Sequence, residues 1–200
     1  SGNVDWYGPY YTDSRKIRWR FHNRVLSNRF GTGFTVKEKH GLTAGIEHRM
    51  YFVDDDISRF NEAELRLWGA LKGPLGNAGH YEGKLQLPVV NNVGNFDLQL
   101  SAEPYLLNND LGLVLRYQLQ RTPPTQLENE AIISQRQVYS NGFNSTLIQR
   151  IGGGVKFRNW LGAELDLINM ENLIYFDTTS LPVQSDDNFT SLRLRAYGHW

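Results

Sequence analysis

Cationic side chains at every second position are the residues of this sequence best suited to chemistry. One such run lies in segment 16–25 and consists of Arg18, Arg20, His22 and Arg24. The same spacing returns near the other end of the chain, at Arg193 and Arg195. One further cation, Lys37, follows the first run. A guanidinium stays charged and binds a carboxylate through two parallel hydrogen bonds. These residues therefore predict a basic wall that attracts anions.

Carboxylates follow the same alternate spacing in other segments. The predicted acidic wall consists of Glu62, Glu64, Glu82, Asp97, Glu103 and Glu164, with Asp166 beside the last. Since 21 basic and 21 acidic residues give a formal charge of zero, the neutral sum would hide two separate walls. Facing walls of opposite charge would orient charged or dipolar solutes between them. The alternative is that these charges pair with one another across a narrow interior.

No catalytic set and no metal site is recognised in the sequence. The chain has no cysteine, and its five histidines are scattered without metal-ligand spacing. Ser140 has no histidine near it in sequence, and the carboxylates in segment 53–59 lack the glycine and distal glutamate of a calcium loop. The prediction is a protein that is not an enzyme and uses no cofactor. Balanced charge also argues against nucleic acid as a partner.

The elements that position these side chains are expected to be β-strands. Apolar and polar residues alternate with period two along almost the whole chain. In segment 80–87 one face carries Tyr81, Gly83, Leu85 and Leu87. Turn signals, among them SNRFGTG at 27–33 and SLPVQSDDNFTS at 180–191, divide the chain into about twelve strands, within a range of 10 to 14. No linker interrupts them, so residues 1–200 are predicted to form one domain.

The apolar faces of these strands indicate contact with lipid. They carry Leu, Ile, Val and Phe together with small Gly and Ala, and small residues suit a lipid boundary better than a packed core. No window approaches eighteen consecutive apolar residues, so no transmembrane helix is expected. Aromatic residues gather near strand ends, as they do at headgroup depth. The predicted fold is an all-β, closed, antiparallel, up-and-down transmembrane β-barrel with outer-membrane lipid as a partner.

Two segments resemble known outer-membrane proteins. The terminal segment SLRLRAYGHW ends on Trp200 and resembles the last strand of such proteins, which the barrel-assembly machinery recognises. The segment HNRVLSNRFGTGFTVKEK resembles the second and third strands of the oligogalacturonate-type porins, which are monomeric twelve-stranded channels for acidic sugars. The resemblance implies a monomer in a bacterial outer membrane, a channel that passes small polar, anionic solutes by passive diffusion.

Three other classes of protein remain open at this stage. They are a structural, assembly or engineered barrel with a closed lumen, a soluble β-barrel or sandwich that binds carbohydrate, and a membrane hydrolase. Detergent dependence separates the membrane proteins from the soluble ones. With both chain ends on the periplasmic side, segments 53–59 and 121–130 would fall where turns are normally short. A strand count that differs from twelve by two would change this arrangement.

Overall fold

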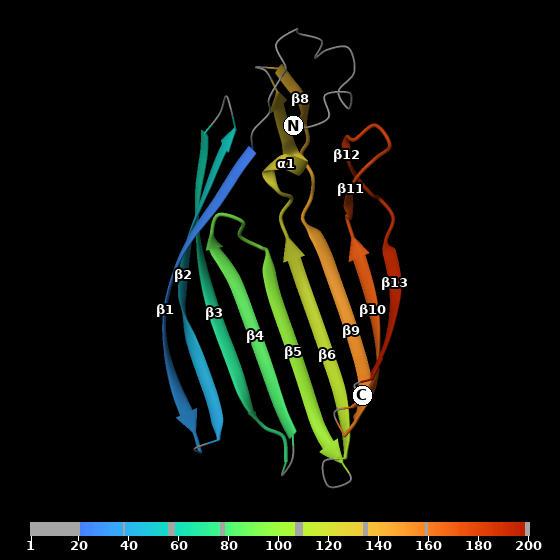
Figure 1. The fold of residues 1–200 in the computed structure, drawn as a ribbon. Coiled ribbons are helices and arrows are strands. Elements are labelled where there is room, and N and C mark those ends of the chain that lie inside the picture. The colour runs from blue at the N-terminus through green and yellow to red at the C-terminus, as the bar shows by residue number, and fades with distance from the viewer. Residues whose placement is uncertain are drawn as a thin grey trace.

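A computed structural model describes residues 21–37, 39–55, 59–76, 79–106, 110–133, 136–158 and 160–198. These residues form thirteen strands and one short helix (Figure 1). In chain order they are β1 (Phe21–Val36), β2 (His40–Asp55), β3 (Arg59–Pro74), β4 (Gly79–Val90), β5 (Phe96–Leu106), β6 (Leu111–Thr122), α1 (Gln126–Asn129), β7 (Glu130–Ile133), β8 (Arg136–Ser140), β9 (Thr146–Phe157), β10 (Leu161–Glu171), β11 (Ile174–Phe176), β12 (Pro182–Gln184) and β13 (Phe189–Gly198). No helix in these ranges is long or apolar enough to cross a membrane.

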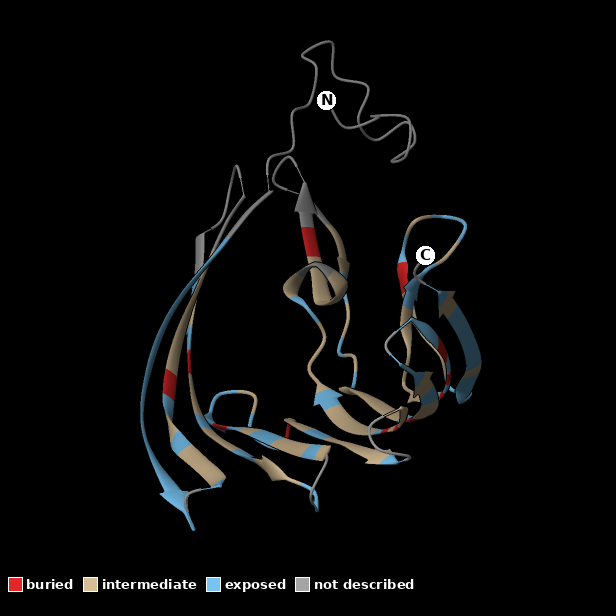
Figure 2. Ribbon diagram, turned by 60° about the horizontal axis from the view of Figure 1, so that its bottom comes forward, coloured by how far each residue is buried: buried red, intermediate tan, exposed pale blue. Residues whose placement is uncertain are grey.

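Nine of the strands form one antiparallel sheet. Their order is β1-β2-β3-β4-β5-β6-β9-β10-β13, so each strand pairs with the next long strand along the chain. β7 with β8, and β11 with β12, form two separate hairpins. The all-β, antiparallel, up-and-down prediction is confirmed. Figure 2 shows the sheet curved into a trough, and within the described ranges β1 and β13 each pair on one side only. Closure of the sheet therefore stays a prediction.

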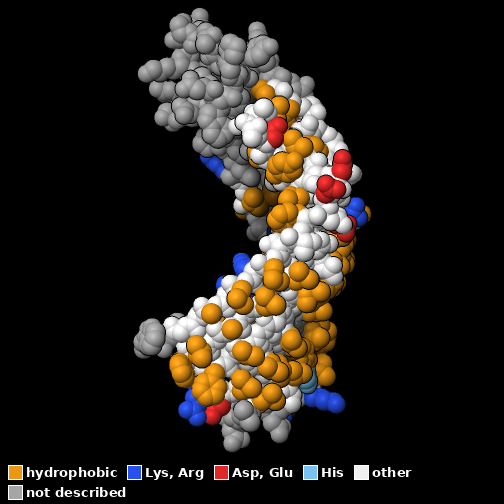
Figure 3. All heavy atoms as spheres, turned by 90° about the vertical axis from the view of Figure 1, so that its right-hand side faces the viewer, with side chains coloured by type: hydrophobic (Ala, Val, Ile, Leu, Met, Phe, Trp, Pro, Cys, Tyr) orange, Lys and Arg blue, Asp and Glu red, His pale blue; other side chains and the backbone are white. Residues whose placement is uncertain are grey.

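The two faces of the sheet have opposite chemistry. On the convex face large apolar side chains are exposed, for example Phe30, Leu115 and Leu194 at 72%, 55% and 72%. Figure 3 shows this apolar surface from the side of β13, with charged side chains along its lower margin. Among the described residues the buried apolar side chains are few, namely Val114, Ala131 and two prolines, Pro88 and Pro182, whereas the carboxylates of Glu64 and Asp166 are each 1% exposed. This distribution is the inverse of a water-soluble core.

The two ends of the sheet differ in the length of their connections. At the lower end in Figure 1, only three or four residues separate β1 from β2, β3 from β4, β5 from β6 and β9 from β10. At the upper end the connections include segments 123–145 and 172–188, which carry α1 and the two hairpins. All long connections thus lie at one end. The conflict foreseen for segments 53–59 and 121–130 is absent, because the strand boundaries differ from those predicted.

The turn predicted at SNRFGTG is wrong, and packing explains why. β1 runs through this segment in unbroken register with β2, and Gly31 pairs with Gly45. A Cβ atom at Gly31 would collide with the indole ring of Trp68. Glycine is therefore needed here because another side chain approaches the strand closely. Glycine is also common in turns, so the sequence alone does not distinguish the two cases. The turn predicted at 180–191 likewise contains a short strand, β12.

Arginine at two neighbouring positions of β5 tests the assignment of the faces. Leu100 lies on the convex face and is 46% exposed, whereas Gln99 lies on the concave face and pairs with Gln118. Leu100→Arg is expected to lower the free energy of unfolding by about 2–4 kcal/mol, because its charge would face lipid. Gln99→Arg should change it by no more than about 0.5 kcal/mol. Denaturant titration in lipid vesicles measures both, and equal costs would contradict the assignment.

Candidate functional site

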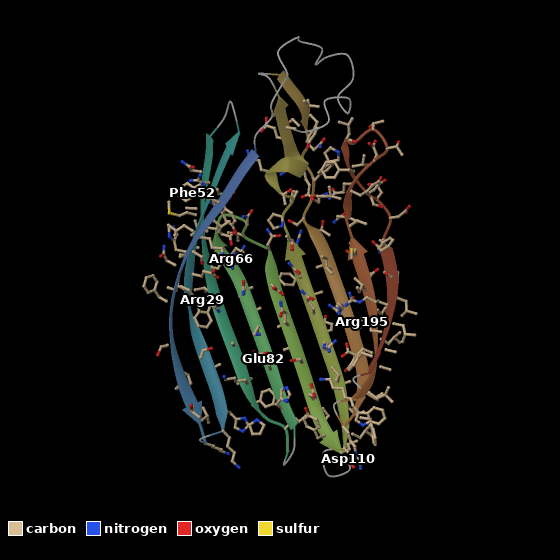
Figure 4. All side chains as sticks on the ribbon, viewed as in Figure 1. Arg29, Phe52, Arg66, Glu82, Asp110 and Arg195 are labelled. Carbon is tan, nitrogen blue, oxygen red and sulfur yellow. The ribbon has the colours of Figure 1, made fainter. Side chains whose placement is uncertain are left out.

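The concave face of the sheet gathers the charged side chains that the strands place at alternate positions. Figure 4 looks onto this face, where Arg66, Glu82 and Arg195 come from β3, β4 and β13. A groove on it is lined mostly by polar side chains of β4, β5, β6 and β9, among them Lys84, Gln99, Ser101, Arg116, Gln118 and Arg150. The face is therefore a polar surface that can bind solutes by charge and hydrogen bonds.

Four arginines and two carboxylates form the largest group of ion pairs among the described residues of this face. We call Arg116, Arg150, Glu164, Asp166, Arg193 and Arg195 the arginine cluster. Arg116 on β6 donates two parallel hydrogen bonds to Glu164 on β10, at 2.8 and 2.9 Å. Oδ2 of Asp166 accepts from Arg150 at 2.6 Å and from Arg193 at 3.1 Å. Nη2 of Arg195 lies 3.4 Å from Glu164 and 3.5 Å from Asp166.

Glycines of β9 make room for the arginine cluster. Gly152 pairs with Asp166 on one side and Arg116 on the other, and Gly154 pairs with Glu164. A Cβ at Gly152 would collide with the carboxylate of Asp166, and one at Gly154 would lie 2.7 Å from the carbonyl oxygen of Ala163. Arg116 can thus cross β9 and reach β10. The segment IGGGVKF serves the packing of charged side chains across a strand.

A second group of ion pairs lies on β2 and β3. Arg49 donates to both oxygens of Glu47, at 2.8 and 3.2 Å, and Ser27 of β1 donates to the same carboxylate at 2.6 Å. Arg66 pairs with Glu64 and donates to the Tyr51 hydroxyl at 3.3 Å. Here two guanidiniums face two carboxylates, so the group is balanced. Buried charges are tolerated because they are paired in this way.

One aromatic side chain of β3 extends across β2 toward β1. The Trp68 ring on β3 extends over Gly45 and Gly31, which pair with each other, and the guanidinium of Arg29 lies 3.8 Å from its centroid. A cation over an indole face is attracted by the ring quadrupole. Bulky side chains thus lie over glycines of neighbouring strands in two places, Trp68 over β1 and β2 and Arg116 over β9.

The predicted basic wall is only partly found. Arg193 and Arg195 lie on the concave face, opposite Asp166 and Glu164 in the register. Arg24 lies on the convex face instead, level with Phe52, because β1 keeps the phase set by Leu26 and the apolar residues after it. The remaining predicted members are placed as follows. Lys37 lies in the turn after β1 with φ of 50°, the side chain of His22 is not described, and Arg18 and Arg20 lie outside the described residues.

The predicted acidic residues all occupy concave-face positions, but they do not form a separate wall. Those placed there by the strand register are Glu62, Glu64, Glu82, Asp97, Glu103 and Glu164. Most have a cation beside them: Glu82 lies 3.0 Å from Lys84, and Glu103 lies 2.8 Å from Lys156. The structure therefore corrects the predicted segregation, because acidic and basic side chains pair along one strand or between nearby strands of the sheet. Pairing across a narrow interior, the alternative that the sequence left open, stays untested because the described strands do not close.

Sequence reasoning missed Arg116 and Arg150 as partners of the acidic residues. Both stand at alternate polar positions of their strands, which is a usable signal, but their partners come from a strand whose order in the sheet the sequence does not fix. No three His, Asp or Glu side chains of the described ranges are placed to hold a metal ion. At the short-turn end, Arg158 donates to Asp110 at 3.0 Å, and this hydrogen bond lowers the pKa of Asp110.

The comparison with known families agrees with the class of protein that the fold indicates. An up-and-down antiparallel sheet that is apolar outside and charged inside is typical of membrane β-barrels. Residues 2–199 match the family described as "Putative porin", and the chain belongs to this family. Neither a curated protein nor a solved structure matches the chain. The match supports the resemblance to porins and does not distinguish the oligogalacturonate type.

Two neighbouring glycines of β9 test the packing beneath the arginine cluster. Gly154→Ala is expected to lower the free energy of unfolding by about 1–3 kcal/mol, because its methyl group would overlap the carbonyl of Ala163. Gly153→Ala is the control, since the nearest atom to its Cβ, the carbonyl oxygen of Val114, is 3.8 Å away. Unfolding in detergent, followed by tryptophan fluorescence, measures the difference. A loss of stability at position 153 as large as that at 154 would contradict this explanation.

Proposed function

We propose that this protein is a channel of the bacterial outer membrane through which small polar solutes diffuse passively. The observation that carries the proposal is the inverted distribution of side chains, with exposed apolar residues on the convex face and paired charges on the concave face. In a bilayer the convex face would contact lipid, and the concave face would line a water-filled lumen. Membership of the porin family supports the same function.

The lengths of the connections support one orientation in the membrane. Outer-membrane barrels have short periplasmic turns and longer extracellular loops. The end with the turns after β1, β3, β5 and β9 is therefore assigned to the periplasm, and the end with α1 and the two hairpins to the cell surface. β13 runs toward the short-turn end (Figure 1), as expected of a strand that the assembly machinery recognises from the periplasm.

Closure of the barrel requires further strands beside the nine of the sheet. Since neighbouring strands alternate in direction, β1 and β13 run parallel to each other. Antiparallel closure therefore needs an odd number of strands between β1 and β13. A membrane requires this closure, because unpaired backbone N–H and C=O groups are costly in the hydrocarbon region. The sequence also predicts a short strand around VDWYGPYY at residues 4–11, which would be one such strand. It lies outside the described residues and stays a prediction.

The arginine cluster supports a preference for anions. Its four guanidiniums and two carboxylates carry two more positive than negative charges. Fixed charges attract counter-ions over a Debye length of about 8 Å at physiological salt, so an excess of this kind acts within the lumen. Acidic sugars, suggested by the resemblance to the oligogalacturonate-type porins, are one class of such anions. The opposing candidate is a structural barrel with a closed lumen, which the dense ion pairing favours.

Electrophoretic mobility tests whether the sheet closes in the folded protein. Closed membrane barrels stay folded in dodecyl sulfate until they are heated, because every strand edge is paired. The unboiled protein is therefore expected to migrate differently from the boiled protein, and to precipitate when detergent is removed. A monodisperse solution without detergent, and one band position before and after boiling, would favour the soluble alternatives.

Ion selectivity in a planar bilayer tests the open lumen. The protein is expected to conduct, with a reversal potential under a salt gradient that shows anion preference. Arg195→Gln should shift this potential toward zero, more at low salt than at molar salt, because screening removes the effect. Arg121→Gln is the control, since Arg121 lies on the convex face opposite Phe96. The absence of any conductance would favour the closed structural barrel.

A further inference from the structure

We propose that the arginine cluster is a binding site for a small oxyanion, a carboxylate or phosphate group. Solutes that carry such a group would occupy this site in turn as they pass through the lumen. The inference rests on the proposed function, because it takes the concave face as the lumen. It goes further by naming the site and the chemical group that the site selects. The residues that would contact the anion are Arg193 and Arg195 of β13 together with Arg150 of β9.

The first argument is charge. Two carboxylates are shared among four guanidiniums, so two positive charges are left without a compensating group among the described residues. The group of Glu47, Arg49, Glu64 and Arg66 on β2 and β3 has as many carboxylates as guanidiniums. An anion that enters the arginine cluster restores the balance that the other group already has.

The second argument is the supply of hydrogen-bond donors. A guanidinium has five N–H groups in a planar fork. Arg193 and Arg195 contact the carboxylates through Nη2, and their side chains are 46% and 48% exposed. Nε of Arg150 is buried and has no hydrogen-bond partner among the described residues. The exposed N–H groups of Arg193 and Arg195 can bind an oxyanion without breaking the existing ion pairs.

The third argument is that the guanidiniums are held in place. Arg193 and Arg195 stand two residues apart on one strand, and both lie against the carboxylate of Asp166. Asp166 is itself 1% exposed and is held by Arg150 at 2.6 Å. Arginines that are anchored in this way lose less conformational entropy when they bind a ligand. The groove lined by Arg116 and Arg150 borders the cluster and gives a solute access from the concave face.

Inorganic phosphate is the probe for this site. In a planar bilayer with chloride as the current carrier and constant ionic strength, phosphate is expected to reduce the current in a saturable way. The double variant Arg193→Gln/Arg195→Gln should raise the half-blocking concentration by about tenfold or more. The matched control is Lys39→Gln/Lys72→Gln, which removes two positive charges that lie outside the arginine cluster and outside the groove beside it and should change the half-blocking concentration by less than about twofold.

Equilibrium dialysis of the detergent-solubilised protein against radiolabelled phosphate separates this inference from the proposed function, since it needs no conductance. Saturable binding that the arginine double variant loses and the lysine double variant keeps supports the site, even if the protein does not conduct. Conductance without saturable binding, or equal losses in both variants, would overturn the site and leave the channel intact. Retention of the heat-dependent gel shift shows that each variant is folded.

Discussion

The pairing of backbone groups between neighbouring strands is the constraint on which the rest of this structure depends. Each long strand is hydrogen-bonded along its length, and side chains alternate between the two faces with period two. Once one strand has placed its odd or even positions on a given face, the pairing register fixes which positions of the next strand lie on that face. Leu67 on β3 pairs with Leu87 on β4, and Leu165 on β10 pairs with Leu194 on β13. One continuous apolar face and one continuous polar face result.

The polar face then has to accommodate charges at close quarters. Strands lie about 4.8 Å apart, so long cationic side chains on adjacent strands would repel one another without carboxylates between them. Asp166 on β10 accepts from Arg150 of β9 and Arg193 of β13, and Glu164 lies between Arg116 of β6 and Arg195 of β13. Gly152 and Gly154 leave the space above β9 in which Arg116 reaches Glu164. Charge pairing and small residues together therefore allow charged side chains to pack closely on the polar face.

Much of the fold could be predicted from the sequence, because alternation and turn composition are local signals. The class of sheet and its apolar face followed from them. The predicted position of Arg24 is wrong for a reason that local signals cannot supply. Val25 and Leu26 are adjacent apolar residues, so the segment admits two phases, and only the pairing of β1 with β2 selects the phase of Leu26.

The pairing of charges was harder to predict than the strands. The acidic residues were expected on the polar face and lie there, yet their partners depend on which strands are neighbours. Arg116 and Glu164 are 48 residues apart in sequence, and β9 between them contributes glycine at the level where they meet. The membership of β13 beside β10, after the β11–β12 hairpin, is likewise a property of the whole sheet.

Thiol labelling along β5 tests the central claim, that the concave face is open to water and the convex face contacts lipid. The chain has no native cysteine, so single cysteines at Ser101 and Ala102 report on two neighbouring side chains of opposite faces. In lipid vesicles, a charged, water-soluble thiol reagent is expected to label Ser101→Cys rapidly and Ala102→Cys at least about tenfold more slowly, since the charged reagent is excluded from lipid. Equal rates at both positions would contradict the assignment of the faces, and no labelling at either would contradict an open lumen.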